Sequence, residues 1–178
     1  MKILPLICIL ALFSNPAASS EYQNIIQKNF SSLKVMDKTD FNMQAINSEL
    51  PPKELKKING MFSLALNDYD GNGLMDFVAL TYNKNIKPKL INKHYFRYYT
   101  LVICLKYKKY TCETITDFKG VYPSQHYLTP ANLYADLECQ NNYFKKGMPA
   151  FYLFPVLGNI WDWGVFYSGK VVMCSAGD

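Results

Sequence analysis

A short acidic stretch is the feature that most restricts how this chain can fold. Residues 68–76 are Asp-Tyr-Asp-Gly-Asn-Gly-Leu-Met-Asp, so side-chain oxygens stand at positions 1, 3, 5 and 9, with a glycine at position 6. The flanking runs 61–66 and 77–82 are short and apolar, as in β-strands. The stretch therefore predicts a tight loop that joins two strands and gathers its carboxylates around one point.

Oxygen ligands at this spacing are typical of calcium loops, because hard cations take several oxygen ligands from alternate positions of a tight turn. The predicted metal ligands are the side chains of Asp68, Asp70, Asn72 and Asp76 and the backbone carbonyl of Leu74. With 9 Asp, 15 Asn and 9 Gly in the chain, such a pattern arises by accident in about one of several hundred chains. Calcium is therefore the predicted cofactor, and a plain turn without metal is the alternative.

The run 64–80 resembles the FG-GAP or VCBS repeat family, whose strand-loop-strand units hold calcium in a D-x-D-x-[DN]-G-x-x-D loop. The resemblance implies the four side-chain ligands named above and a local calcium-binding hairpin. It covers about 17 of 178 residues in a single copy, so the family's propeller architecture is not implied. An EF-hand would need a bidentate Glu at position 12, where this chain has Ala79. We therefore expect weak affinity, on the order of 10⁻⁴ to 10⁻³ M.

The N-terminus has the pattern of a secretory signal. Lys2 precedes an apolar run over 3–13, and small residues follow over 14–20. Residues 1–20 are therefore the predicted signal peptide, and 21–178 are predicted to form a single globular domain. The apolar run is short for a membrane span, which makes an uncleaved anchor the less favoured alternative. We expect a periplasmic or secreted protein without a membrane span.

Four cysteines remain after the signal: Cys104, Cys112, Cys139 and Cys174. An even number in an exported chain favours two disulfides over a zinc site. Four cysteines allow three pairings, and spacing alone leaves all three open. If strands 99–104 and 110–116 form a hairpin centred on Lys108, the first two cysteines lie opposite each other. We prefer this pairing, with the remaining two cysteines joined to each other.

The fold class predicted is α+β, with N-terminal helices packed on a mainly antiparallel sheet built of hairpins. Apolar spacing predicts a helix over 21–35. A second, short helix is signalled by residues 48–52, with proline near its first turn and Gly60 just past its end. Short apolar runs predict strands over 61–66, 77–82, 99–104, 110–116, 150–154, 164–167 and 170–174. Residues 119–146 look irregular, with a single helical turn starting at Thr129-Pro130.

Catalytic residues are not evident in the sequence. His94 and His126 are the candidates, yet neither has a nucleophile motif nearby, so surface or hydrogen-bonded histidines are the favoured interpretation. Trp161 and Trp163 would share one face of a strand, either as a binding platform or as core residues. The net charge of +5 becomes +4 without Lys2, which is too mild for a nucleic-acid binder.

The sequence is compatible with three functions. The leading hypothesis is a non-enzymatic exported protein that binds a protein partner, such as an inhibitor or immunity-type factor. The second is a cell-envelope hydrolase that uses His94 or His126 as general acid or base. The third is a purely structural envelope module. An active surface is expected in the loops 84–97 or 121–146.

Overall fold

The computed structural model describes residues 16–41, 43–49, 52–53, 62–91, 94–96, 98–115, 126–155 and 162–175. The helical elements are α1 (Pro16–Asn29), a 3-10 turn (Lys38–Asp40) and α2 (Met43–Glu49). The strands of the first half are β1 (Leu33–Val35), β2 (Leu64–Asn67), β3 (Asp76–Asn83), β4 (Lys89–Ile91), β5 (His94–Phe96), β6 (Tyr99–Lys106) and β7 (Tyr110–Thr114). Those of the second half are β8 (His126–Asn132), β9 (Leu137–Cys139), β10 (Asn142–Phe144), β11 (Pro149–Pro155), β12 (Asp162–Tyr167) and β13 (Lys170–Ser175).

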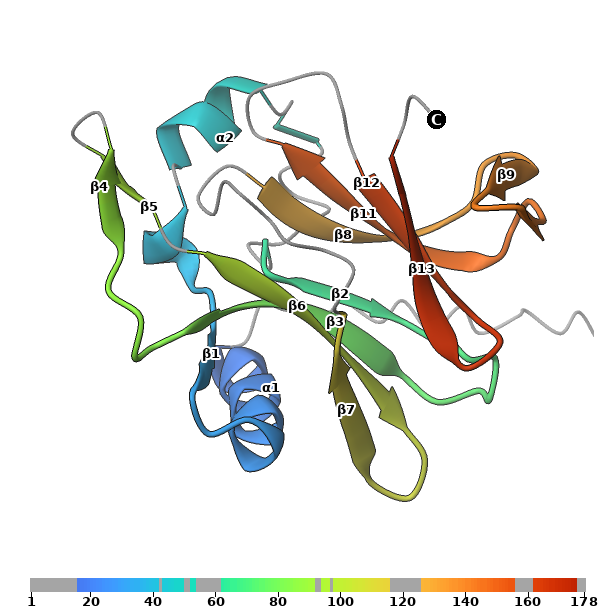
Figure 1. Ribbon diagram of the computed structural model, residues 1–178, viewed down its shortest axis with the longest axis horizontal. Helices are drawn as coiled ribbons and strands as arrows, with labels where there is room; N and C mark the ends of the chain where they lie inside the picture. Colours follow the sequence, from blue (N-terminus) through green and yellow to red (C-terminus); the bar gives the residue numbers. More distant parts are fainter. Residues whose placement is uncertain are drawn as a thin grey trace, which may run out of the picture.

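Two larger antiparallel sheets form the body of the molecule (Figure 1). The N-terminal sheet has the order β1-β3-β6-β7, with β2 also paired to β3, and the C-terminal sheet has the order β13-β12-β11-β8. The hairpins β4–β5 and β9–β10 each form a separate two-stranded sheet. The predicted α+β class is therefore matched only in part, because the described chain is mostly antiparallel β-structure with few helices.

The two sheets meet where β8 runs along β2. The amide of Leu128 donates to the carbonyl of Phe62 at 2.7 Å, and the Asn67 side chain donates to the carbonyl of Ala131 at 2.9 Å. These bonds tie the two sheets at both ends of β2. As a result, the loop that follows β2 is anchored to both sheets.

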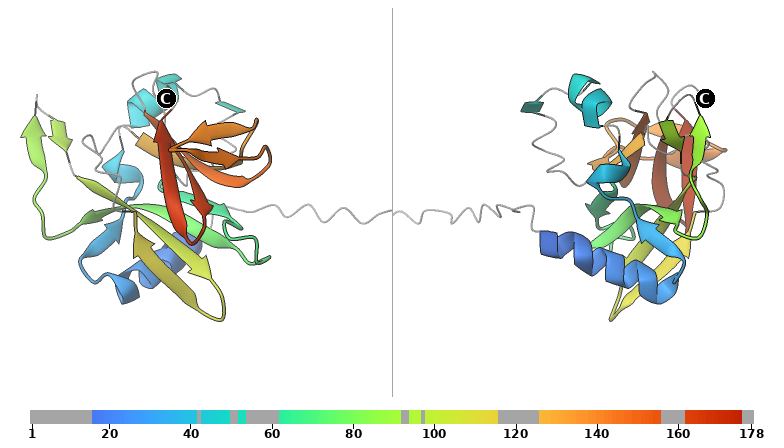
Figure 2. Two further views of the ribbon diagram at one scale, coloured as in Figure 1. Left: turned by 45° about the vertical axis from the view of Figure 1, so that its right-hand side comes forward. Right: turned by 90° about the vertical axis from the view of Figure 1, so that its left-hand side faces the viewer.

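Alternation of side chains along the strands creates three apolar layers. Val78 and Leu80 of β3 face a central core between the sheets, whereas Phe77 and Ala79 face the opposite layer. That outer layer of the N-terminal sheet is covered by α1, which buries Ile26 completely. Figure 2 shows α1 lying across this face. A third layer lies on the outer face of the C-terminal sheet, under the β9–β10 hairpin.

The first helix ends earlier than predicted. A helix was predicted over 21–35, but α1 ends at Asn29, and Leu33–Val35 instead pair with β3 as β1. Leu33 and Val35 both pack into the layer under α1, as expected for residues two positions apart on a strand, whose side chains point to the same face. The predicted second helix falls mostly on residues outside the described part. α2 ends at Glu49, before most of the predicted span, and Pro52 and Lys53 within that span are helical.

The region predicted to be irregular contains three strands within its described part. Thr129 and Pro130 do not start a helical turn but lie inside β8, where Pro130 stands opposite Phe151. The Leu128 amide points toward Phe62 and away from β11. Backbone groups two positions apart on a strand point the same way, so the nitrogen of Pro130 also points away from β11. The missing N–H of Pro130 therefore faces away from β11, so the ladder between β8 and β11 loses no hydrogen bond.

The other predicted strands are confirmed with small changes in their ends. The hairpin β6–β7 has the predicted register, with Cys104 opposite Cys112. Both preferred disulfides are present, Cys104–Cys112 and Cys139–Cys174. The sequence Ser168-Gly169 forms the predicted two-residue turn between β12 and β13, with φ of 49° and 81°. Such positive φ angles suit a tight hairpin turn.

Candidate metal centre

The acidic stretch forms the loop between β2 and β3. Asn67 and Asp76 face each other as the last pair of the β2–β3 ladder, so the loop starts and ends at one point. Gly71 and Gly73 have φ of 75° and 82°, a backbone conformation that L-residues rarely adopt. These two glycines let the chain reverse tightly enough to turn its alternate side chains inward.

Three of the predicted ligands converge. Carboxylate oxygens of Asp68, Asp70 and Asp76 all lie within 4.8 Å of one another. At 4.8 Å two unit charges repel by about 0.9 kcal/mol in water and by about 3.5 kcal/mol at an effective dielectric constant of about 20. Among the described residues, no lysine forms a salt bridge with this cluster. The donor set therefore fits a bound cation, and all its oxygens are the hard ligands that such a cation prefers.

Backbone amides hold the carboxylates of the first two aspartates in place. The Asn72 amide donates to Asp68 at 3.0 Å and to Asp70 at 3.1 Å, and the Gly73 amide donates to Asp68 at 2.9 Å. These bonds orient the carboxylates before any ligand binds. The loop is therefore preorganised for a cation.

Asp76 is the buried member of the cluster. Its side chain accepts hydrogen bonds from the amides of Tyr69 at 2.9 Å, Asp70 at 3.4 Å and Lys106 at 2.7 Å. Burial raises the pKa of Asp76 above its ordinary value of 3.8, and the neighbouring Asp70 charge adds to this, while the three amides act against it. A cation at the loop would favour the ionised form of this carboxyl group.

The other two predicted ligands are Asn72 and the backbone carbonyl of Leu74. The Asn72 side-chain oxygen accepts from the Leu74 amide at 2.8 Å, and its NH₂ group donates to Asp70 and to the Lys106 carbonyl, both at 2.9 Å. The Leu74 side chain is exposed. The part played by these two residues in metal binding stays a prediction.

The loop is fixed on one side by Tyr69. This residue stands at position 2 of the loop, and its ring is buried against Phe151 in the central core, with centroids 6.0 Å apart. Its hydroxyl donates to the Ala65 carbonyl at 3.2 Å. Burial raises the pKa of the Tyr69 phenol well above its ordinary value, so it remains a neutral anchor.

On the other side the loop contacts the β6–β7 turn, which sequence reasoning missed. The Lys106 amide bonds Asp76, the Tyr110 hydroxyl donates to the Met75 carbonyl at 3.2 Å, and a hydrogen bond to Asp70 raises the pKa of the Tyr107 phenol. The contact follows from pairing of β3 with β6, in which Phe77 stands opposite Cys104. No local sequence signal predicts that pairing, because the two strands are separated by the β4–β5 hairpin.

The β9–β10 hairpin carries a second group of polar and aromatic side chains. Cys139 is bonded to Cys174, and the Gln140 side chain donates to the Met173 carbonyl at 2.9 Å, so the hairpin covers part of the β13 edge. Phe144 is fully buried beneath the hairpin, with its ring 5.7 Å from that of Trp163. This is the core role predicted as one alternative for Trp163, whereas Trp161 lies outside the described residues.

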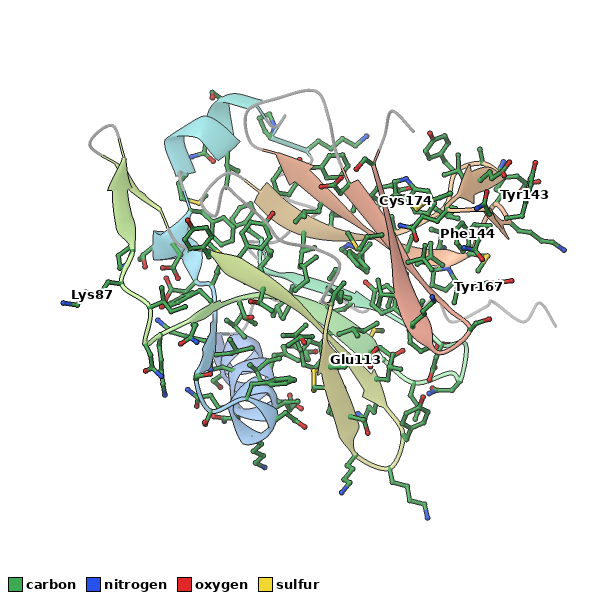
Figure 3. The ribbon with its side chains drawn as sticks, viewed as in Figure 1. Lys87, Glu113, Tyr143, Phe144, Tyr167 and Cys174 are labelled. Atoms are coloured by element: carbon green, nitrogen blue, oxygen red, sulfur yellow. A yellow bond between two sulfur atoms is a disulfide. The ribbon has the colours of Figure 1, made fainter. Side chains whose placement is uncertain are left out.

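Tyr143 of this hairpin and Tyr167 at the end of β12 are both exposed to solvent. Tyr143 is 73% exposed and Tyr167 is 38% exposed, although the Tyr167 ring lies edge-on against Phe144 with centroids 5.4 Å apart. Figure 3 shows Phe144, Tyr167 and Cys174 together at this end of the C-terminal sheet, with Tyr143 on the outer side of the hairpin. We call Tyr143 and Tyr167 the tyrosine surface.

The two histidines lie on strands and not in the loops that were expected. His94 begins β5 and His126 begins β8, which belong to different sheets. Their side chains lie outside the described part of the structure, so the catalytic role considered for them stays untested.

Comparison of the chain with protein-family models, with curated proteins and with solved structures finds no match. The FG-GAP/VCBS resemblance therefore rests on the loop residues alone. Within the described segments, no helix is both long and apolar enough to cross a membrane. The two disulfides indicate an oxidising compartment, either extracellular or periplasmic.

Proposed function

We propose that this chain is an exported, calcium-stabilised, non-enzymatic protein that binds a protein partner, as an inhibitor or an immunity-type factor does. The observation that carries the proposal is the exposure of two tyrosines: Tyr143, on a hairpin linked to β13 by the Cys139–Cys174 disulfide, and Tyr167, at the end of β12. Tyrosine provides a large contact area at low cost in side-chain entropy, and it is enriched among the residues that dominate binding energy. The tyrosine surface is therefore the face assigned to the partner.

Calcium is the metal that best suits the acidic loop in this setting. Asp68, Asp70 and Asp76 would hold the ion, and Asn72 and the Leu74 carbonyl would complete its ligands. All of these donors are oxygens, and calcium accepts flexible sets of oxygen ligands more readily than magnesium does. When bound, calcium offsets the repulsion among the carboxylates and links the loop ends, so its role here is structural.

Export is supported by the signal-like residues 1–20 and by the two disulfides. A periplasmic or secreted location would also supply calcium at concentrations suited to a weak site. The location and the cofactor are therefore mutually consistent.

Thermal unfolding tests the metal part of the proposal. At a calcium concentration of about 100 Kd, binding should stabilise the fold by about 2.7 kcal/mol, which raises Tm by about 5 to 11 °C for a domain of this size. Magnesium at the same concentration should give a smaller rise, and EDTA should reverse the effect. An equal Tm in calcium and in EDTA would refute the calcium site.

Cross-linking in a periplasmic or secreted extract tests the partner. The wild-type protein should capture one specific protein, and the double variant Tyr143→Ser with Tyr167→Ser should lose it. Tyr98→Ser is the matched control, because Tyr98 is also half exposed but directly precedes β6 of the N-terminal sheet. Loss in the control alone, or capture of the same protein by the double variant, would contradict the assignment of this face.

A further inference from the structure

Two turns that lie next to each other carry the exposed apolar side chains Leu74, Met75 and Tyr107. These residues are 40%, 52% and 52% exposed, and they account for three of the eight large hydrophobic side chains that are exposed in the described chain. Leu74 and Met75 belong to the acidic loop, and Tyr107 belongs to the β6–β7 turn. The structure thus concentrates apolar surface at a place where no other described element covers it.

The two turns are held together as one unit. The Asn72 side chain donates to the Lys106 carbonyl at 2.9 Å, and the Tyr110 hydroxyl donates to the Met75 carbonyl at 3.2 Å. The disulfide Cys104–Cys112 closes the strands just behind the second turn. In Figure 2 (left) both turns project from the same side of the N-terminal sheet.

Three lysines flank Tyr107 on the β6–β7 turn. Lys108 and Lys109 are exposed on the β6–β7 turn, and Lys106 lies beside them with its ammonium 5.3 Å from the centre of the Tyr110 ring. Glu113, the nearest acidic residue on β7, lies on the part of the strand away from the turn (Figure 3). We call Leu74, Met75, Tyr107 and these three lysines the tip.

The charge of this region depends on the acidic loop. The tip has three lysines, and the acidic loop has the three carboxylates of Asp68, Asp70 and Asp76, so the net charge is zero when all six groups are ionised. A bound divalent cation would leave a net charge of +2. Positive charge around protruding apolar side chains complements a bilayer, in which anionic headgroups lie above an apolar interior.

We propose that the tip docks on an anionic lipid surface when a divalent cation occupies the acidic loop. The metal dependence rests on the calcium binding proposed above, whereas the apolar and basic side chains are independent of it. Leu74 and Met75 would enter the interface, and Lys108 and Lys109 would contact the headgroups. A lipid surface fits better than a protein partner, because a stable protein interface needs about 800 Å² on each side, whereas a narrow unit of two turns can insert a few apolar side chains among the headgroups.

Vesicle co-sedimentation tests the proposal with the full mature chain. Vesicles of phosphatidylcholine containing phosphatidylglycerol are compared with vesicles of phosphatidylcholine alone, each in calcium and in EDTA. We expect binding to the anionic vesicles in calcium only. Replacing Lys108 and Lys109 by Gln should lower the partition coefficient about 30-fold, and Leu74→Ser with Met75→Ser should lower it about tenfold.

The β3–β4 turn provides a matched control. Ile86 is 54% exposed and lies between the exposed Lys84 and Lys87, but this turn has no acidic loop, and Figure 3 shows Lys87 far from β7. Ile86→Ser should leave vesicle binding unchanged. Because all these side chains are exposed, each variant should also keep the wild-type Tm in EDTA.

The outcomes separate this proposal from the calcium site itself. If calcium raises Tm but the protein stays free of anionic vesicles, or if the tip variants bind as well as Ile86→Ser, docking is refuted and calcium binding stands. If calcium leaves Tm unchanged and vesicle binding is equal in calcium and EDTA, the metal-dependent docking is refuted together with the site. Binding to an acidic protein in place of the vesicles would likewise overturn the lipid assignment.

Discussion

The two disulfides close loops of very different length, which gives a quantitative prediction. Cys139 and Cys174 are separated by 35 positions, whereas Cys104 and Cys112 are separated by 8. In the chain-entropy model the longer closure contributes about 3.8 kcal/mol and the shorter about 2.6 kcal/mol. Replacing each pair by alanine should therefore cost about 1.2 kcal/mol more for the longer loop.

The packing around the two disulfides does not reverse this order. Cys104 is fully buried in the layer under α1, Cys112 packs against that layer, and Cys139 and Cys174 are both about 5% exposed in the layer under the hairpin. Both double variants thus create cavities of similar kind. Tm should fall by about 8 to 15 °C without Cys139–Cys174 and by about 5 to 10 °C without Cys104–Cys112.

Urea titration of the two double-alanine variants, with the reduced wild type as control, measures the difference in unfolding free energy. The reduced wild type should be at least as unstable as the less stable variant. A larger loss in the Cys104→Ala, Cys112→Ala variant would refute the chain-entropy reasoning. It would mean that the short disulfide acts mainly in the folded state, by holding the β6–β7 turn against the acidic loop.

Three further predictions concern single residues. Gly164→Ala should lower the unfolding free energy by about 1 to 3 kcal/mol, because an added Cβ would overlap the Phe151 ring and lie 2.8 Å from the Met173 sulfur. A urea titration measures this loss, and adding Phe151→Leu to the Gly164→Ala chain should restore part of it. Phe144→Ala should lower the unfolding free energy by about 3 to 5 kcal/mol. It should also shift the tryptophan fluorescence to longer wavelength, because it exposes Trp163 to solvent. An unchanged fluorescence spectrum would contradict the packing of Phe144 on Trp163. Protonation of Asp76 should favour the metal-free fold, because the pKa of Asp76 is raised on folding; this contribution to stability is complete below the unfolded pKa of 3.8 and is lost as pH rises through the folded pKa. Calcium binds the ionised carboxylate, so calcium should raise Tm at about pH 7 and leave Tm unchanged at about pH 3. Thermal scans with calcium and with EDTA at the two pH values measure this difference.

Local sequence signals predicted much of the β-structure. The runs around β3, β6, β7, β12 and β13 were identified with small errors at their ends, because short apolar runs between turn residues leave few alternatives. The pairing of Cys104 with Cys112 followed from a hairpin register that depends only on the residues between them. Such features are local, so no knowledge of the tertiary structure was needed.

Errors occurred where a pattern fits two structures. Phe30 and Leu33 have helical spacing, but Leu33 and Val35 also alternate as a strand, and pairing with β3 decided in favour of β1. Pro130 suggested a helical turn, yet β8 accepts it because its position faces away from the β11 ladder. In both cases a distant strand supplied the deciding hydrogen bonds.

The sequence by itself determined the composition of the acidic loop, its strand flanks and its glycine positions, because alternation and tight turns are set within a few residues. The tertiary structure decided that Asp76 is buried, that Tyr69 enters the central core, and that the loop is bonded to the β6–β7 turn. These facts depend on β3 pairing with β6 and on β2 lying beside β8, contacts between segments far apart in the chain. Local patterns specify which groups a loop offers, and only the packing of distant strands specifies what surrounds them.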